Sequence, residues 1–364
     1  MLKYGIIGLG NLGEKIAKNL IKKGFSVKIF DKDQKNINKL VKLGAIKSKS
    51  ISEVANEVDG LITCLPSPKI STEVMAGVDG AILYMKSGST WIETSTTDIN
   101  ELKKVSEIAK EKGVKTIEAP VTGGVHRAEK GIITVLVGAD KQTFYEHERA
   151  IKTFGGKIFY LGDLGSASVL KVITNMLAFA NLIGAIEGLM LAKKAGLDLT
   201  TTYHAIQSSS GNSVEFETVA PVIFNGSFDT SFSLKLACKD LSLMTSLGDK
   251  FNIPMKFTKL IEEMFYEAKS KYGDEEWTPN IVKDVEKAAG ENIRAPNFPD
   301  KKIDEYLSSI GLNLGSHYNA SVSYFKTSYD FEIPTDDKKD VETGNNKYSK
   351  YYVKGEIHNS WLVV

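Results

Sequence analysis

A regular alternation of short apolar runs with helical patterns extends from Leu2 to about Gly165 and constrains the fold more than any other feature. Strands that alternate with helices form βαβ units, in which the strands run parallel and the helices cover both faces of the sheet. The pattern therefore predicts an α/β fold with a doubly wound, mostly parallel sheet over residues 1–165. The predicted strands are YGIIGL, SVKIF, GLITCL, STWIET, KTIEAP, ITVLVG and KIFYLG, and the clearest predicted helices are Asn11–Lys23, Ile99–Lys112 and Lys141–Phe154.

The character of the chain changes twice after this region. Residues 166–294 have helical periodicity nearly throughout, and Val169–Ala195 is predicted to be one long helix that ends at Gly196. We therefore expect an all-helical second domain. Residues 295–364 are rich in Asp, Lys, Asn and Tyr, and their role is unknown. SVSYFKTSYDFEI and KYYVKGEI could form short strands there, and we favour an accessory element packed on the helical domain or on a neighbouring subunit over disorder.

The long predicted helix contains an apolar stretch, Val172–Ala192, that approaches the length of a membrane span. It also contains Asn175, Asn181 and Glu187. A helix that is apolar on nearly every side is either a membrane span or the buried centre of a soluble bundle. We favour the bundle centre and expect no membrane partner.

Charge and cysteine content exclude several classes of protein. The net charge is +1, so no overall field attracts nucleic acid or an acidic membrane surface. Cys64 and Cys238 lie far apart, and the five histidines have no metal-ligand spacing. We therefore expect neither a disulfide scaffold nor a metal site. The cysteine content and the early start of the first strand favour a reducing, cytoplasmic compartment.

A glycine-rich turn joins the first predicted strand to the first helix. In this context, Gly8 permits a tight turn, Gly10 lets the backbone approach a pyrophosphate, and Gly13 lets the helix lie close to the sheet. The unpaired N–H groups and the dipole at the helix N-terminus also favour an anion. The turn therefore predicts a Rossmann-type dinucleotide site formed by Gly8, Leu9, Gly10, Asn11, Leu12 and Gly13.

An acidic residue, Asp31, closes the second predicted strand about 20 residues further on. A carboxylate at this position can accept hydrogen bonds from the ribose hydroxyls of NAD, and it repels the additional phosphate of NADP. NAD is therefore the expected cofactor and NADP the less favoured one, although the neighbouring Lys32 could weaken the exclusion.

Two further stretches carry polar groups suited to catalysis. In EAPVTGGVHRAEKG, Thr122 supplies a hydroxyl, while Gly123 and Gly124 expose N–H groups that suit a carboxylate. A plain loop is the alternative. In GSASVLKVITN, Lys171 and Asn175 lie on one helix face. Lys171 is a surface residue in one reading. If it instead faces a cleft, burial and the positive charge of a nicotinamide would lower the pKa of its amine toward working pH.

Taken together and in this order, these stretches resemble the β-hydroxyacid dehydrogenase family, which includes 3-hydroxyisobutyrate dehydrogenases, tartronate semialdehyde reductases and 6-phosphogluconate dehydrogenases. The match extends from about Leu2 to Arg294. The resemblance implies hydride transfer between NAD and the β-hydroxyl of a small carboxylate substrate. It assigns the role of acid/base to Lys171 and that of a substrate-orienting amide to Asn175. A homodimer or homotetramer built on the helical domain is implied as well.

The resemblance also assigns binding residues. TCLPSP, with Leu65 and Pro66, is similar to the strand end beside the adenosine, and IETSTT places Thr96 near the cofactor. Lys239, followed by Asp240, falls where the family has a lysine that reaches the cofactor; taken alone, KLACKDLSL would suggest an exposed ion pair. APVTGG is similar to the substrate loop, which implies that Thr122, Gly123 and Gly124 bind the substrate carboxylate.

Departures from the family pattern leave alternatives open. Arg127 stands where the family commonly has glycine, which favours a second anionic group on the substrate, although an outward-facing Arg127 is equally compatible. Thr122 replaces the usual serine, and Ala167 replaces a glycine. The alternatives to a dehydrogenase are a non-catalytic dinucleotide-binding scaffold or sensor, an imine reductase, and an oxidative decarboxylase. The last would need a phosphate clamp, for which only Arg127 and His126 are candidates.

Overall fold

The computed structural model describes residues 2–295, 298, 318–323 and 326–331. The chain forms two compact units, Met1–Arg294 and Ala295–Val364. The predicted border between residues 165 and 166 lies inside the first unit and stays a prediction, as does the role of residues 295–364.

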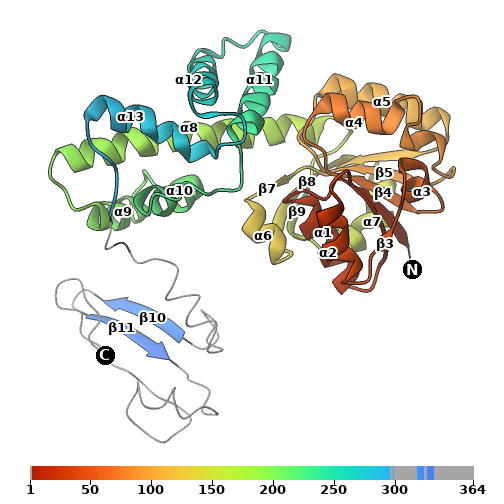
Figure 1. Ribbon diagram of the computed structural model, residues 1–364, viewed down its shortest axis with the longest axis horizontal. Helices are drawn as coiled ribbons and strands as arrows, with labels where there is room; N and C mark the ends of the chain where they lie inside the picture. Colours follow the sequence, from red (N-terminus) through yellow and green to blue (C-terminus); the bar gives the residue numbers. More distant parts are fainter. Residues whose placement is uncertain (1, 296–297, 299–317, 324–325, 332–364) are drawn as a thin grey trace, which may run out of the picture. The chain divides into compact units, whose positions relative to one another are not determined.

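A nine-stranded sheet forms the first part of unit 1 (Figure 1). The strand order β3-β2-β1-β4-β5-β6 is parallel throughout, as expected for a Rossmann-type sheet. Beyond it, β8 runs antiparallel to β6 and β7 and pairs with β9 in parallel. The strands are β1 (Lys3–Ile7), β2 (Ser26–Phe30), β3 (Ile46–Lys47), β4 (Gly60–Thr63), β5 (Thr90–Glu93), β6 (Lys115–Glu118), β7 (Val121–Thr122), β8 (Ile133–Ala139) and β9 (Gly155–Tyr160).

Helices cover both faces of this sheet (Figure 1). One core cluster joins the sheet to side chains of α1, α2, α6 and α7, and the other joins it to α3, α4 and α5. These helices are α1 (Gly13–Lys22), α2 (Gln34–Val41), α3 (Ile51–Ala55), α4 (Pro68–Ala76), α5 (Ile99–Glu111), α6 (Val125–Glu129) and α7 (Lys141–Ile151), with a 3-10 turn η1 (Ala81–Leu83). The predicted doubly wound α/β fold is confirmed.

The second part of unit 1 is all-helical, as predicted, and is built around α8 (Ser166–Lys194). Figure 1 shows this helix leaving the sheet and running through the other helices, all of which pack against it. They are α9 (Leu199–Gln207), α10 (Val214–Phe224), α11 (Leu234–Lys250), α12 (Lys256–Tyr272) and α13 (Val282–Ala289), with a 3-10 turn η2 (Thr278–Ile281). By length and composition α8 could cross a membrane, a weak test that the core helix of a soluble bundle also passes.

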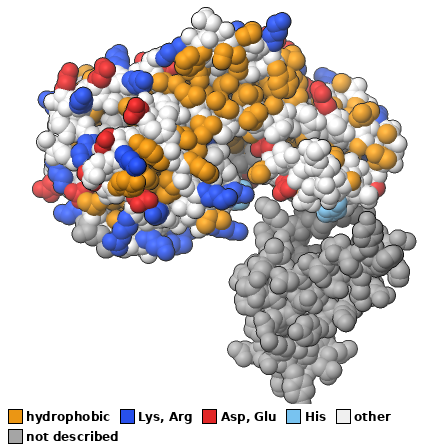
Figure 2. Space-filling view, turned by 180° about the vertical axis from the view of Figure 1, so that it is seen from behind, with side chains coloured by type: hydrophobic (Ala, Val, Ile, Leu, Met, Phe, Trp, Pro, Cys, Tyr) orange, Lys and Arg blue, Asp and Glu red, His pale blue; other side chains and the backbone are white. Residues whose placement is uncertain are grey.

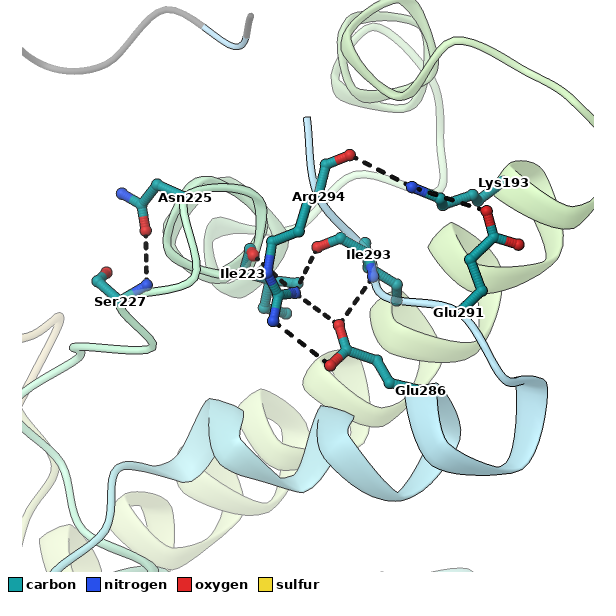
Figure 3. A network of polar contacts seen from close by, with 8 residues as sticks. All are labelled: Lys193, Ile223, Asn225, Ser227, Glu286, Glu291, Ile293 and Arg294. Atoms are coloured by element: carbon teal, nitrogen blue, oxygen red, sulfur yellow. Dashed lines mark hydrogen bonds and ion pairs between the residues drawn. The ribbon is translucent and has the colours of Figure 1, made fainter. Parts of the chain in front are cut away.

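A polar network closes the helical domain at Arg294 (Figure 3). The Arg294 guanidinium donates to Glu286 Oε1 at 2.6 Å and to the carbonyl of Ile223 at 3.3 Å. Glu286 Oε1 also accepts from the backbone N–H of Ile293 at 2.8 Å. Because Glu286 is 6% exposed, this nearly buried carboxylate fastens the last residues of unit 1 onto α10 and α13.

Unpartnered apolar side chains remain on the helical domain. Figure 2 shows hydrophobic side chains gathered over this part of the molecule. The exposed ones include Leu177, Leu191, Phe251, Phe257 and Leu260. A surface of this kind suits contact between copies of the chain, but the expected homodimer or homotetramer stays a prediction.

Unit 2 contains an antiparallel pair, β10 (Tyr318–Ser323) and β11 (Lys326–Phe331). The strand β11 falls within the predicted segment SVSYFKTSYDFEI, whereas β10 begins three residues before that segment and overlaps only its first three residues. The predicted segment KYYVKGEI lies outside the described residues.

Candidate active site

The glycine-rich turn lies between β1 and α1, and its glycines have different neighbours. Gly8 has φ +92°, and a Cβ added there would lie 2.2 Å from the carbonyl oxygen of Cys64. A Cβ on Gly13 would lie 1.9 Å from the carbonyl oxygen of Gly8. A Cβ added to Gly10, in contrast, would have no heavy atom within 4 Å outside its own neighbouring backbone. The fold itself therefore requires Gly8 and Gly13, while the space beside Gly10 is open to a ligand.

The N-terminus of α1 also suits an anion. Its N-cap residue, Leu12, provides no side-chain hydrogen bond to the first-turn N–H groups, of which that of Glu14 donates to the carbonyl of Gly10 at 3.1 Å. Those groups and the helix dipole favour a phosphate at this point. The open space at Gly10 lies beside this helix end, so the residues present fit the pyrophosphate of a dinucleotide.

Asp31 follows β2 and ties the glycine turn to the neighbouring strand. Its Oδ2 accepts from the backbone N–H of Leu9 at 2.5 Å, and its Oδ1 accepts from the N–H of Asp33 at 2.6 Å. A carboxylate has about four acceptor sites, so both oxygens can still accept from a ribose. The bond to Leu9 was not foreseen from the sequence, and it gives Asp31 a role in shaping the turn.

The other predicted cofactor residues lie at the ends of β4 and β5. Leu65 packs beside the glycine turn, with its Cδ2 at 3.1 Å from the position of a Cβ on Gly8, and its N–H donates to Ser95 Oγ at 2.7 Å. Pro66 precedes an open pocket whose lining is Ser67, Pro68, Lys69, Thr72, Glu73 and Glu101. This arrangement suits the adenosine end of a dinucleotide.

A buried carboxylate, Glu118, holds the first turn of α8. It ends β6, is 0% exposed, and accepts from the N–H groups of Gly165, Ala167 and Ser168 at 2.6, 2.8 and 3.0 Å. Its Oε2 also accepts from the Ser168 hydroxyl at 2.5 Å. Burial raises the pKa of Glu118, while these donors oppose that shift. The carboxylate therefore caps a helix whose N-cap, Gly165, has no side chain, and it fixes the helix relative to the sheet.

Lys171 begins a chain of partly buried polar contacts one turn further along α8. It is 8% exposed, and its Nζ donates to Asn175 Oδ1 at 2.6 Å. Asn175 Nδ2 in turn donates to Asp240 Oδ2 of α11 at 2.5 Å. Lys239 Nζ lies 2.6 Å from Asp240 Oδ1 and donates to the carbonyl of Thr96 at 2.8 Å. The lysine, the amide and the carboxylate therefore hold one another in a fixed order between two helices and the end of β5.

The environment of Lys171 changes its acidity. Burial lowers the pKa of the amine to about 8, Asp240 opposes this shift, and the charge of Lys239 adds to it. A pKa near neutrality gives an amine that can both release and accept a proton at working pH. Asp240 is 2% exposed, so the exposed ion pair considered for this helix is wrong. Sequence reasoning did not assign Asp240 to the site, although it lies next to the predicted Lys239.

The predicted substrate loop connects β7 to α6. Gly123 and Gly124 have φ values of +112° and +88°, a region that favours glycine. Thr122 ends β7, and both β7 and β8 pack against α8, which carries Lys171. The Arg127 side chain folds back over the loop, with its Cδ at 3.2 Å from the position of a Cβ on Gly123. Arg127 is partly exposed, and its contact with a substrate stays a prediction.

Two polar contacts bring the cofactor residues and the helical domain together. Asn11 Nδ2 of the glycine turn donates to the carbonyl of Ser231 at 3.4 Å, and Lys239 reaches Thr96 as described. The glycine turn and the end of β5 thus both touch the helical domain. In the described part of the chain, His, Cys, Asp and Glu side chains form no group of three that could hold a metal ion.

Two family descriptions and several known proteins match this chain in sequence. A family described as the NAD binding domain of 6-phosphogluconate dehydrogenase matches residues 3–162, and one described as NAD-binding of NADP-dependent 3-hydroxyisobutyrate dehydrogenase matches residues 165–284. The chain is 33% identical over 265 residues to 2-(hydroxymethyl)glutarate dehydrogenase of Eubacterium barkeri, with 72% of this chain and 88% of that protein covered. It is 30% identical over 268 residues to mitochondrial 3-hydroxyisobutyrate dehydrogenase of Rattus norvegicus, with 72% and 80% covered.

A solved structure gives the same fold. The crystal structure of 3-hydroxyisobutyrate dehydrogenase from Salmonella typhimurium superposes with a TM-score of 0.73 at 24% sequence identity. The match covers 78% of this chain and 100% of that chain.

Proposed function

The chain belongs to the β-hydroxyacid dehydrogenase family, and we propose that it transfers a hydride between NAD and a small β-hydroxy acid with Lys171 as the acid/base. As a member of this family, it is an NAD(P)-dependent oxidoreductase that acts on a CH–OH group. The observation that carries the proposed role of Lys171 is its partly buried chain of hydrogen bonds through Asn175 to Asp240. A nearly buried amine with a lowered pKa, linked to the end of β5 beside the proposed cofactor site, favours catalysis over a scaffold.

Binding of the cofactor is assigned to the turn from Gly8 to Gly13, with Asp31 toward the ribose and Lys239 and Thr96 at the end of β5. When bound, the nicotinamide accepts the hydride in oxidation and supplies it in reduction. Gly10 leaves room for the pyrophosphate, and the N–H groups at the start of α1 hold its charge.

Proton transfer is assigned to Lys171. In oxidation, the neutral amine takes the proton of the substrate hydroxyl; in reduction, the ammonium returns it to the carbonyl oxygen. Asn175 fixes the amine through Oδ1, and Asp240 fixes the amide of Asn175. One N–H of Asn175 Nδ2 and one lone pair of Oδ1 remain available to the substrate. Thr122 and the N–H groups of Gly123 and Gly124 bind the substrate carboxylate.

The experiment that tests this function is an assay of NADH formation with a panel of hydroxy acids. The panel contains 3-hydroxypropionate, 3-hydroxyisobutyrate, serine, threonate, glycerate and sulfonated analogues. We expect oxidation of at least one carboxylate, and a much lower rate with its methyl ester, because the ester cannot fill the carboxylate site. Tight NAD binding without NADH formation from any of these acids would favour the scaffold instead.

Cofactor preference gives a separate prediction. We expect a KM for NADP at least about tenfold above that for NAD, since about 1.4 kcal/mol of repulsion between Asp31 and the additional phosphate is enough. Asp31→Ser should narrow this ratio by removing the charge. Lys32→Ala is the matched control beside it and should leave NAD preferred. Steady-state kinetics with both cofactors makes the comparison, and a wild-type preference for NADP would rule out this role of Asp31.

A further inference from the structure

The Arg127 side chain lies over the proposed substrate loop. In Arg127, Nη1 and Nε lie 3.8 and 3.9 Å from the position of a Cβ on Gly123. Arg127 is only partly exposed. Its guanidinium therefore lies against the loop that supplies the N–H groups of the proposed carboxylate site, and a side chain on Gly123 would press on its Cδ at 3.2 Å.

The helix that carries Arg127 is held firmly in place. Ala128 is 0% exposed, and its carbonyl accepts from Asn19 Nδ2 of α1 at 2.8 Å. Glu129 forms ion pairs with Lys15 and Lys18 of the same helix. The backbone is thus anchored to α1 at the two residues that directly follow Arg127.

Charge near Arg127 is not balanced by the protein. The nearest acid along the chain, Glu129, is already engaged by two lysines, which hold its pKa down at about 2, chiefly through hydrogen bonds from Lys15 and Lys18. In the part of the chain that the structure describes, no carboxylate lies within ion-pair distance of the Arg127 guanidinium. A planar fork of N–H donors beside an anion-binding loop suits a second carboxylate, which it can bind through two parallel hydrogen bonds.

We propose that Arg127 binds a second carboxylate of the substrate, so that the preferred substrate is a β-hydroxy dicarboxylic acid. One carboxylate lies on Thr122 and the glycine loop, and the other lies on the guanidinium above Gly123. This inference rests on the proposed function, because it adds a specificity group to the same site. The competing anion is a phosphate of the cofactor, which the kinetics below separates from the substrate.

The test compares acids that share one reacting centre. Two 2-(hydroxymethyl) diacids, with one or two methylene groups before the second carboxylate, are compared with their distal monomethyl esters and with 3-hydroxyisobutyrate. For wild type and Arg127→Gln, kcat and KM are measured for each acid and for NAD. We expect Arg127→Gln to lower the ratio of kcat/KM for diacid over ester by about 10- to 100-fold, mainly through the KM of the diacid, since this is the range for one charge-assisted hydrogen-bonded pair.

Two control variants separate a direct contact of Arg127 with the substrate from a general effect of positive charge near the site. Arg127→Lys keeps the charge without the fork and should restore part of the preference for the diacid. Lys130→Gln removes an exposed positive charge from the end of the same helix and should leave the ratio unchanged. An equal fall for diacid and ester, or a fall that appears only in the KM for NAD, would overturn the proposal.

A binding measurement keeps this inference separate from the proposed function. Calorimetric titration of the NAD complex with a 2-methyl diacid, which lacks the reacting hydroxyl, needs no turnover. We expect Arg127→Gln to weaken this binding by about 10- to 100-fold. If no hydroxy acid is oxidised but this dependence holds, the proposed reaction fails and the diacid site stands. If oxidation occurs and the dependence is missing, the diacid site fails alone.

Discussion

Replacement of Lys171 by methionine is expected to lower kcat by about 10²- to 10⁴-fold, the range for loss of a general acid/base, while NAD binding is retained. Methionine fills much of the volume of the lysine stem but carries no proton. Asn175 Oδ1 would lose the donor that now lies at 2.6 Å, yet the glycine turn would be untouched. Single-turnover kinetics and a fluorescence titration with NADH measure the two quantities. Near-normal turnover in this variant would remove Lys171 from the role.

The pH dependence of the same reaction has a defined sign. Oxidation needs the neutral amine, so its kcat should rise as pH increases through about 8 and then level off. Reduction needs the ammonium, so its kcat should fall over the same interval. In Lys171→Met, the residual kcat of both directions should no longer depend on pH near 8, because no other group in the proposed step titrates in that range.

The second large effect concerns the glycine turn, where two substitutions of the same size should behave differently. Gly10→Ala should fold with unchanged thermal stability, because no heavy atom beyond the neighbouring backbone lies within 4 Å of the added Cβ. It should nevertheless weaken NAD binding by about tenfold or more, since displacing the pyrophosphate from one charge-assisted hydrogen bond costs about 1.5–3 kcal/mol. Calorimetry of the cofactor-free protein and titration with NAD measure both effects.

Gly13→Ala is the matched comparison. Its Cβ would lie 1.9 Å from a backbone oxygen of the turn, which cannot move away as a side chain could. We expect a loss of stability of at least about 1–3 kcal/mol, the usual range for overpacking, seen as a lower Tm. Unchanged NAD affinity in Gly10→Ala would show that the pyrophosphate lies elsewhere. Unchanged stability in Gly13→Ala would contradict the close approach of α1 to the turn.

Much of the fold could be predicted because its signals are local. The strand SVKIF was predicted at the residues of β2, and the long helix was placed within a few residues of α8. The short strands β3 and β7 were missed, since two residues each are too few for any periodicity. The antiparallel direction of β8 could not be predicted either. An apolar run does not state its direction, and the chain returns through β7 and α6 rather than through a full crossover.

The candidate site shows the same division between near and distant contacts. Lys171 and Asn175 were found because a spacing of four residues places them on one helix face. Glu118 and Asp240 were missed as site residues because their partners lie 47 to 50 and 65 residues away in the sequence. Their signal was an acid within an apolar segment, which must find donors if it is buried. The contact of the Arg127 side chain with the Gly123 loop is likewise one that spacing alone does not reveal.

The pKa of Lys171 is the most direct test of the account, because catalysis here depends on a buried amine that exchanges its proton near neutral pH. It can be measured in the cofactor-free protein by NMR titration of ¹³Cε-labelled lysine, with Lys171→Met to assign the resonance. We expect a value of about 8. A value at the ordinary 10.5 of an exposed lysine would contradict it.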